Sequence, residues 1–299
     1  MDGILNIYKE QDFTSHDVVA KLRGILHMKK IGHTGTLDPQ ATGVLPVCLG
    51  RATKACDMMT GKSKVYEAVL LLGVQTDTED MTGNVLEKRD VTVGESEVQD
   101  VIESFLGTYQ QVPPMYSAIK VNGKKLYELA REGKTIERTP RPVTIYELTI
   151  LDMDLPRVHL RITCSKGTYI RSLCRDIGER LSCGGCMEEL IRTRVGHFLI
   201  ENALTLNQVE ALVRKGRIEE VIEPVDRIFA SFPSVYATPK NQKLALNGNP
   251  LPEEGLELSE SAKTPGQWIR LYDEKKNFIG IYEYDPDRKR IKPVKMFLS

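Results

Sequence analysis

The sequence predicts an α+β fold, with a large first region of mixed helices and strands and a small β-rich region after it. Two patterns support this prediction. Apolar residues recur at helical spacing in some segments, such as residues 18–26, and alternate with polar ones in others, such as residues 158–164. Near Phe232 the sequence pattern changes to that of a small region with short strands. We therefore expect one domain over residues 1–232 and a second over residues 233–299.

The elements of the first half follow from periodicity and from punctuating residues. Ser15 is a candidate cap for a helix that ends near His27, and Asn122-Gly123 is a hairpin signal before a helix that Gly133 ends. Strands are expected at residues 3–8, 44–49 and 66–74, and helices at residues 15–27, 51–60, 95–106 and 126–131.

The elements of the second half follow from the same kinds of signal. Thr205 and Gln208 form a capping box for a helix to Lys215, and Thr238 with Pro239 opens another helix. A 3.6-residue apolar stripe predicts a helix over residues 170–181. Strands are expected at residues 143–152, 158–164, 268–272, 278–284 and 293–298.

Composition gives no bulk argument for a polyanionic partner, because Lys plus Arg and Asp plus Glu both number 41. The distribution of charge along the chain does give such an argument. Residues 77–103 carry nine acids and two bases, whereas residues 117–142 carry seven bases and three acids. Segregated charge fits a polyanion bound on one side, although ordinary solvated surfaces are the alternative. No apolar run reaches the ~20 residues of a membrane span, so we expect a cytoplasmic protein with no membrane partner.

A glycine-bracketed loop between residues 32 and 50 holds His33 and Asp38, with Pro39 directly after the aspartate. Proline biases Asp38 toward extended geometry, and an acidic side chain on a turn next to a buried strand is a plausible reactive carboxylate. The alternative is a structural turn in which the aspartate bonds its own backbone.

Two further features point to an anionic ligand or partner. Arg171 lies in the first turn of a predicted helix, where the helix dipole disfavours a cation, so we expect an anionic group beside it; an exposed, unpaired arginine is the alternative. Residues 109–142 form a long basic segment with Tyr116 and Tyr127. It fits a flexible arm that grips a nucleic acid, or else a solvated excursion.

Six cysteines in a chain of this kind are expected to be free thiols. Cys183 and Cys186 form a CGGC motif, which is either redox-active, half of a zinc site, or incidental. No second CxxC or CxxH accompanies it, so we predict no metal.

Taken together, several separated motifs resemble those of the bacterial tRNA pseudouridine-55 synthases. The resemblance covers the expected first domain in the family's order and spacing, and is weaker in the C-terminal region, which resembles a PUA-like RNA-binding domain. The motifs are GHTGTLDPQATGVLPVCLGRATK (32–54), KVYEAVLLLGVQTDTED (64–80), PPMYSAIKVNGKKLYELAREG (113–133) and CSKGTYIRSLCRDIGERL (164–181).

The resemblance implies a pseudouridine synthase fold with a central mixed, largely antiparallel sheet flanked by helices. It implies that Asp38 is the catalytic aspartate, Tyr66 the tyrosine that stacks on the target base, and Arg171 the partner of the aspartate. His33, Tyr169 and Leu190 match positions that line the pocket for the flipped nucleotide. Residues 117–142 match a mobile thumb that closes on the T-arm of tRNA. Candidate RNA contacts are Lys9, Lys64, Lys120, Lys124 and Lys125.

The implied reaction isomerises a T-loop uridine of tRNA to pseudouridine, with Asp38 as nucleophile toward C1′ of the sugar or C6 of the base. No redox step or phosphate transfer occurs, so we expect neither cofactor nor metal. The sequence has no coiled-coil pattern, and we expect a monomer. One departure concerns the first strand, where Tyr8-Lys9-Glu10 stands in place of the family's Asp-Lys-Pro.

Three other interpretations fit parts of the sequence. Thr34 to Leu37 resembles part of the DKTGTL motif of aspartyl-phosphate enzymes, but there the aspartate precedes the TGT, and here Asp38 follows it. A non-catalytic RNA-binding protein would need no pairing of Asp38 with Arg171. A zinc module built on CGGC is the third, and metal analysis of the purified protein tests it.

Overall fold

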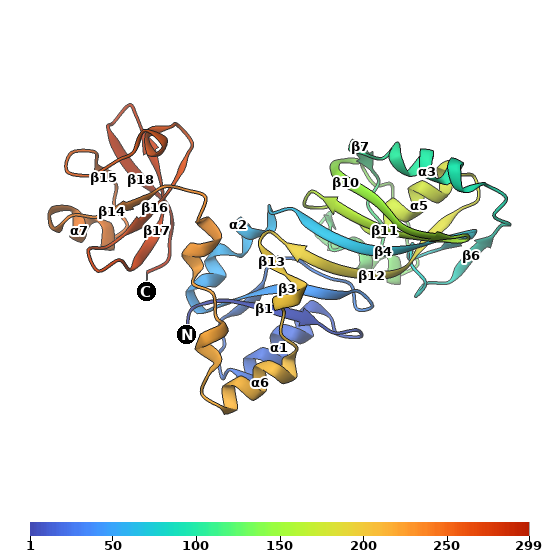
Figure 1. Cartoon of the computed structure of the whole chain (residues 1–299), viewed down its shortest axis with the longest axis horizontal. Coiled ribbons are helices and arrows are strands. Elements are labelled where there is room, and N and C mark those ends of the chain that lie inside the picture. Colours follow the sequence, from blue (N-terminus) through green and yellow to red (C-terminus); the bar gives the residue numbers. More distant parts are fainter. Residues whose placement is uncertain (299) are drawn as a thin grey trace.

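The computed structural model describes residues 1–298, which contain two large sheets (Figure 1). The main sheet has nine strands, seven of them in the order β1-β3-β12-β4-β11-β10-β7. Its strands are β1 (Gly3–Lys9), β2 (Ile31–His33), β3 (Thr42–Leu49), β4 (Lys64–Leu72), β7 (Gly107–Gln111), β10 (Arg141–Asp154), β11 (Arg157–Cys164), β12 (Gly185–Val195) and β13 (Phe198–Leu199).

The main sheet is mixed but largely antiparallel. Only the short pairing of β12 with β3, at Ile191 and Arg192, is parallel among its pairings in residues 1–298. The predicted α+β class is confirmed. Two small hairpins accompany the sheet, namely β5 (Val74–Thr76) with β6 (Val85–Lys88) and β8 (Lys120–Val121) with β9 (Lys124–Lys125).

Helices cover the two ends of the main sheet. α1 and α6 pack beside β1 and β3, and α3 and α5 pack beside β4, β10 and β12, as Figure 1 shows below and above the sheet. The helices are α1 (Ser15–Ile25), α2 (Cys56–Thr60), α3 (Glu95–Glu103), α4 (Leu126–Arg131), α5 (Ile170–Arg180), α6 (Leu206–Arg214) and α7 (Pro239–Leu246). No helix within residues 1–298 is both long and apolar enough to cross a bilayer.

A second sheet of five strands follows, at the left of Figure 1, in the order β14-β16-β17-β18-β15. An aromatic cluster around Phe229 joins this sheet to the first part of the chain. The ring centroid of Phe229 lies 6.3, 6.3 and 6.0 Å from those of Trp268, Phe278 and Phe297. Its strands are β14 (Ser234–Tyr236), β15 (Leu251–Pro252), β16 (Trp268–Tyr272), β17 (Phe278–Asp285) and β18 (Arg290–Met296). The boundary near residue 232 stays a prediction.

Several local predictions were wrong. The cap of α1 is Thr14, whose side chain forms a capping box with Asp17, whereas Ser15 lies inside the helix. The strand expected over residues 66–74 is divided at Gly73, which has a φ of +83°. The last strand begins at Arg290 and not at Pro293. Strand β12 was not predicted at all.

Candidate active site

Asp38 lies on a turn of the loop between β2 and β3, and its side chain is 40% exposed. The backbone carbonyl of Asp38 accepts from Ala41 N at 3.1 Å, which closes the turn. On the neighbouring residue, the backbone of Leu37 bonds the buried hydroxyl of Ser15, with Leu37 N donating at 2.9 Å. The loop is therefore fixed to α1 immediately before the carboxylate.

Lys9 fixes the same loop immediately after Asp38. Its Nζ donates to the carbonyl oxygens of Phe13 at 2.6 Å, Pro39 at 2.9 Å and Glu10 at 3.1 Å. The side chain is completely buried, and its ammonium is used inside the fold. Its role as an RNA contact stays a prediction. Burial lowers its pKa to about 8, and the negative charge of Asp38 opposes that change.

Arg171 has the anionic partner that its position at a helix start predicts. Its Nε lies 3.0 Å from Asp38 Oδ2, and its side chain is only 5% exposed. Nη1 donates to the carbonyl of Thr78 at 2.8 Å and Nη2 to the carbonyl of Tyr116 at 2.9 Å. The exposed-arginine alternative is excluded. A buried guanidinium with a partner on each of its three nitrogens holds one oxygen of a carboxylate that solvent still reaches.

A second acid, Asp80, faces Arg171 from the other side. Its Oδ2 lies 3.5 Å from Arg171 Nη1, while its Oδ1 accepts from the hydroxyls of Thr78 and Thr82 at 2.7 and 2.6 Å. The next residue back, Glu79, has a φ of +65° and is held by Arg175 and by Ser172 Oγ at 2.5 Å. The residue segment 78–82 is thus fixed to α5, which supplies Arg171.

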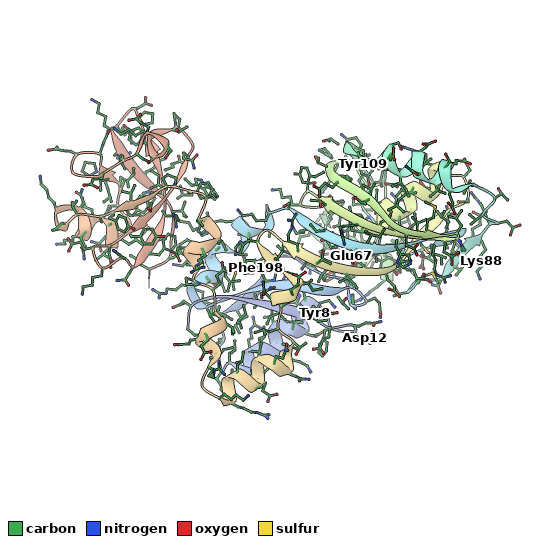
Figure 2. All side chains as sticks on the ribbon, viewed as in Figure 1. Tyr8, Asp12, Glu67, Lys88, Tyr109 and Phe198 are labelled. Atoms are coloured by element: carbon green, nitrogen blue, oxygen red, sulfur yellow. The ribbon has the colours of Figure 1, made fainter. Side chains whose placement is uncertain are left out.

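Tyr66 and Leu190 lie on neighbouring central strands, β4 and β12, and both are buried in one apolar cluster with Leu37 and Ala41 of the loop. Burial raises the pKa of the Tyr66 hydroxyl, the positive charge of Arg192 opposes that rise, and the charge of Asp38 adds to it. Leu37 and Ala41, on either side of Asp38, therefore belong to the same cluster as Tyr66 and Leu190. In Figure 2, Glu67 marks the strand at this point.

Tyr169 precedes α5 and is half-buried. Its backbone is clamped by the amide of Gln111, which donates to the Tyr169 carbonyl at 3.0 Å and accepts from its N–H at 2.9 Å. Burial raises the pKa of Tyr169, and the charge of Asp38 contributes to that rise. Tyr169 thus belongs to the same site.

His33 lies at the end of β2, at the start of the Asp38 loop. Its ring meets the ring of His16 edge-on, with 5.4 Å between centroids, and its buried Nδ1 has no hydrogen-bond partner among residues 1–298. Burial, and then the charge of His16, lower the pKa of His33, so the neutral ring is favoured.

The remaining lysine candidates divide into two kinds. Lys64 is buried and donates to the carbonyls of Thr60 and Lys62, so its ammonium, like that of Lys9, is used inside the fold, and its role as an RNA contact stays a prediction. Lys120, Lys124 and Lys125 lie on the predicted β8–β9 hairpin, where Lys120 and Lys124 are exposed. Lys125 bonds the hydroxyl of Tyr127 at 3.1 Å.

Arg192 and Asp80 belong to the site but were not proposed from the sequence. Arg192 is on β12, the strand that sequence patterning missed. Asp80 ends the family motif at residues 64–80. Its place in that motif was the only signal for it in the sequence.

All six cysteines are free thiols, and Cys183 and Cys186 are both buried. Cys186 Sγ contacts Met81 Sδ at 3.5 Å, and Cys183 Sγ faces the Gly184 carbonyl. Within residues 1–298, no group of three or more His, Cys, Asp and Glu side chains is placed to hold a metal ion.

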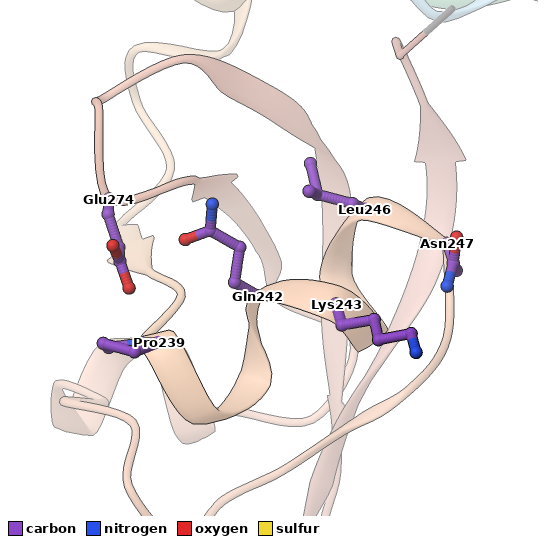
Figure 3. Close-up of a pocket in the computed structure, with 6 residues that line it drawn as sticks. All are labelled: Pro239, Gln242, Lys243, Leu246, Asn247 and Glu274. Atoms are coloured by element: carbon purple, nitrogen blue, oxygen red, sulfur yellow. The ribbon is translucent and has the colours of Figure 1, made fainter.

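A separate pocket of about 530 Å³ lies along α7, the helix that accompanies the second sheet (Figure 3). Its lining is polar at Gln242, Lys243, Asn247 and Glu274. It contains none of the residues described above.

Comparison with solved structures defines the class of the fold. The chain superposes on a chain of the structure titled "Crystal Structure of a Cbf5-Nop10-Gar1 Complex" with a TM-score of 0.77 and 26% identity, over 99% of this chain and 85% of that one. The two chains share their fold over almost the whole length of this one.

Sequence comparison gives the family. A model described as "TruB family pseudouridylate synthase (N terminal domain)" matches residues 23–170, and one described as "tRNA pseudouridylate synthase B C-terminal domain" matches residues 171–230. Proteins named "tRNA pseudouridine synthase B" from Lachnoclostridium phytofermentans and Alkaliphilus oremlandii are 57% and 44% identical, covering 100% of this chain and 100% and 99% of their own. This chain belongs to the TruB family of pseudouridylate synthases, and the predicted pseudouridine synthase fold is confirmed.

Proposed function

We propose that this enzyme converts the uridine at position 55, in the T-loop of tRNA, to pseudouridine, with Asp38 as the catalytic nucleophile. The observation that carries the proposal is the half-exposed Asp38 carboxylate held by the buried Arg171 at 3.0 Å, next to Tyr66 and Tyr169. The relatives named "tRNA pseudouridine synthase B" support tRNA as the substrate.

The reaction rearranges bonds without net oxidation. The N1–C1′ bond of uridine breaks, the base turns, C5 bonds to C1′, and the proton on C5 is lost while N1 gains one. A carboxylate oxygen of Asp38 attacks either C1′ or C6 and holds one fragment during the rotation. No cofactor or metal is consumed by this sequence of steps.

Arg171 pairs with the Asp38 carboxylate and fixes its orientation. Because Arg171 is bonded to two backbone carbonyls and faces Asp80, it holds Asp38 Oδ2 without reorganising. The other oxygen, Oδ1, is then directed at the substrate.

The target base must leave its stack before it reaches this site. We propose that Tyr66 stacks on the flipped base, that Leu190 and Tyr169 line its pocket, and that His33 fills the space the base vacates. Stacking on an aromatic ring returns about 1–3 kcal/mol of the few kcal/mol that unstacking requires. The lowered pKa of His33 suits a neutral wedge in the RNA and not a proton carrier.

RNA binding is assigned to the basic arm and the second sheet. Residues 117–142, with Lys120, Lys124 and Lys125, form the thumb that closes on the T-arm, and residues 233–299 form a PUA-like domain that adds contacts. We further propose that the enzyme is a cytoplasmic monomer.

The decisive experiment compares wild type with Asp38→Asn on an unmodified tRNA transcript. Wild type converts the T-loop uridine without added cofactor, and a transcript with cytidine at that position is the control substrate. The variant should lose turnover by at least about a thousandfold and bind RNA within about tenfold of wild type. Retained turnover would refute the assignment of Asp38. Binding without turnover in the wild type would instead identify a non-catalytic RNA-binding protein.

A further inference from the structure

Arg192 is the largest side chain that is fully buried in residues 1–298, with 1% of its surface exposed. It lies in the second half of β12, and its guanidinium donates to three backbone carbonyls, two in the Asp38 loop and one in β3. Nε donates to Val44 O at 2.7 Å, Nη2 to Gly35 O at 3.1 Å and Nη1 to Thr36 O at 3.4 Å.

This arginine has no carboxylate partner among the ion pairs of residues 1–298. An unpaired buried charge is strongly unfavourable unless other polar groups replace its water. Here the carbonyls of Gly35, Thr36 and Val44 do so. The loop that carries Asp38 and the first part of β3 therefore solvate Arg192, and moving the loop would leave the charge with only the Val44 carbonyl of these three partners.

Backbone geometry shows that the contact is close and built into the sheet. Arg192 pairs with Gly43 of β3 on one side and with Tyr66 of β4 on the other. A Cβ atom on Gly43 would overlap the carbonyl oxygen of Arg192, and a Cβ on Gly35 would lie 3.7 Å from its Nη1. Gly43 therefore lets β3 approach the backbone of Arg192, whereas Gly35 lies at ordinary contact distance from its guanidinium.

We propose that Arg192 is a positioning residue for the isomerisation, which fixes the Gly35–Thr36 backbone before Asp38 and places a positive charge beside the Tyr66 hydroxyl. The inference rests on the proposed function, because Asp38 and Tyr66 are the groups it would position. A lysine cannot substitute, since one ammonium on a flexible stem does not reproduce the planar fork that meets three carbonyls.

The test uses Arg192→Lys and Arg192→Met in the full chain, with Arg157→Met as the matched control. Arg157 is an exposed β11 arginine paired with Glu188 at 2.7 Å. We expect both Arg192 variants to lower the single-turnover rate at least about thirtyfold while the Kd for tRNA changes less than about threefold. The control should stay within about twofold in both.

Two further readouts separate positioning from general damage. Each variant is assayed below its own melting temperature, and Arg192→Lys keeps a folded comparison if Arg192→Met unfolds. In combination with Tyr66→Phe, Arg192→Lys should lower the rate by less than the product of the single effects, because the two act on one element. The Tyr66 hydroxyl, followed by NMR of labelled tyrosine, should titrate at higher pH in Arg192→Met than in wild type.

The outcomes are distinct. Turnover within about twofold of wild type in Arg192→Lys, or a loss explained wholly by weaker tRNA binding, would overturn the inference while the function stands. An active Asp38→Asn enzyme in the same assay would remove the proposed mechanism itself.

Discussion

Buried cations hold the Asp38 loop at the level of single residues. Lys9 of β1 and Arg192 of β12 donate to backbone carbonyls of the loop, whereas Arg171 of α5 pairs with the Asp38 carboxylate itself. A carbonyl does not change protonation state with pH, so Lys9 and Arg192 keep their acceptors in the loop whatever the state of Asp38. The loop geometry is in this way separated from the chemistry of its carboxylate.

Lys9 gives a pH-dependent test of this arrangement. Its pKa is lowered from 10.5 to about 8 in the folded protein, so between those values the unfolded chain binds more protons. The free energy of unfolding should then rise with pH from about 8 to 10.5 on account of this residue. Lys9→Met should show a smaller rise than wild type in urea unfolding at pH 7.5 and 9.5.

Lys64, whose pKa is also lowered to about 8, contributes a similar rise that persists in the Lys9 variant and serves as an internal reference. An identical pH dependence in wild type and Lys9→Met would show that the ammonium of Lys9 is solvated and its pKa unshifted.

The residue-level predictions differ in how much information the sequence contained. Arg171 was tractable because a cation at a helix start needs an anion. Lys9 was also readable: Leu5, Ile7 and Lys9 follow the period-2 inward face of β1, so its burial was implied by register. The three acceptors that make the burial tolerable come from the fold and could not be read.

At the scale of elements, the start of α1 separates helix stability from loop geometry. Thr14 caps the helix, while the adjacent Ser15 bonds the backbone of Leu37. Thr14→Ala should lower the free energy of unfolding by about 1 kcal/mol without changing the rate on bound tRNA. Ser15→Ala leaves a buried Leu37 N–H unpaired and should slow turnover severalfold. Parallel unfolding and single-turnover measurements check both, and equal rates in the two variants would contradict the division.

Gly43 permits the close contact between β3 and β12. It has a φ of +101°, and a Cβ there would lie 2.9 Å from Arg192 N in addition to overlapping its carbonyl oxygen. Gly43→Ala should destabilise the protein by about 2–4 kcal/mol in urea unfolding. Gly133, with a φ of +72° and open space around it, is the control. Gly133→Ala should destabilise by only about 1–2 kcal/mol. Similar values for both would mean that backbone strain alone matters at Gly43.

Strand β12 was missed for a physical reason. It is covered on both faces over much of its length, so its residues do not alternate cleanly between apolar and polar. Its two register shifts against β4 disturb the alternation further. The two sequence features that did attract attention nearby, the CGGC motif and Leu190, gave no information about pairing. Arg192 was lost with the strand that carries it.

At the scale of the whole molecule, the predicted separation of charge lies on distinct elements. The basic residues gather on the β8–β9 hairpin and α4, and the acidic ones on the β5–β6 hairpin and α3. Lys124 is exposed and pairs with Glu132 at 3.1 Å. Exposed pairs of this kind contribute little to stability, so the lysine is free to exchange its partner for a phosphate.

Lys124→Ala should weaken tRNA binding and reduce the slope of log K against log salt by about 0.7–0.9. Lys215→Ala, an exposed lysine at the end of α6, is the control and should leave the slope unchanged. Binding isotherms from 50 to 200 mM salt decide the matter, since an unchanged slope for Lys124→Ala would remove it from the phosphate contacts.

The position of β12 also orders the events of folding. β3 and β4 come from the first quarter of the chain, but each pairs with β12 and not with the other, so the sheet has a gap until residues 185–195 arrive. During synthesis, two long apolar strands must wait with unpaired edges while more than a hundred further residues are made. Such long-range pairing forms slowly, and the same strand that delivers Arg192 and Leu190 to the site is the one that closes the sheet. Asp38 therefore acquires its surroundings at a late step, and a nascent chain shorter than that has no assembled centre.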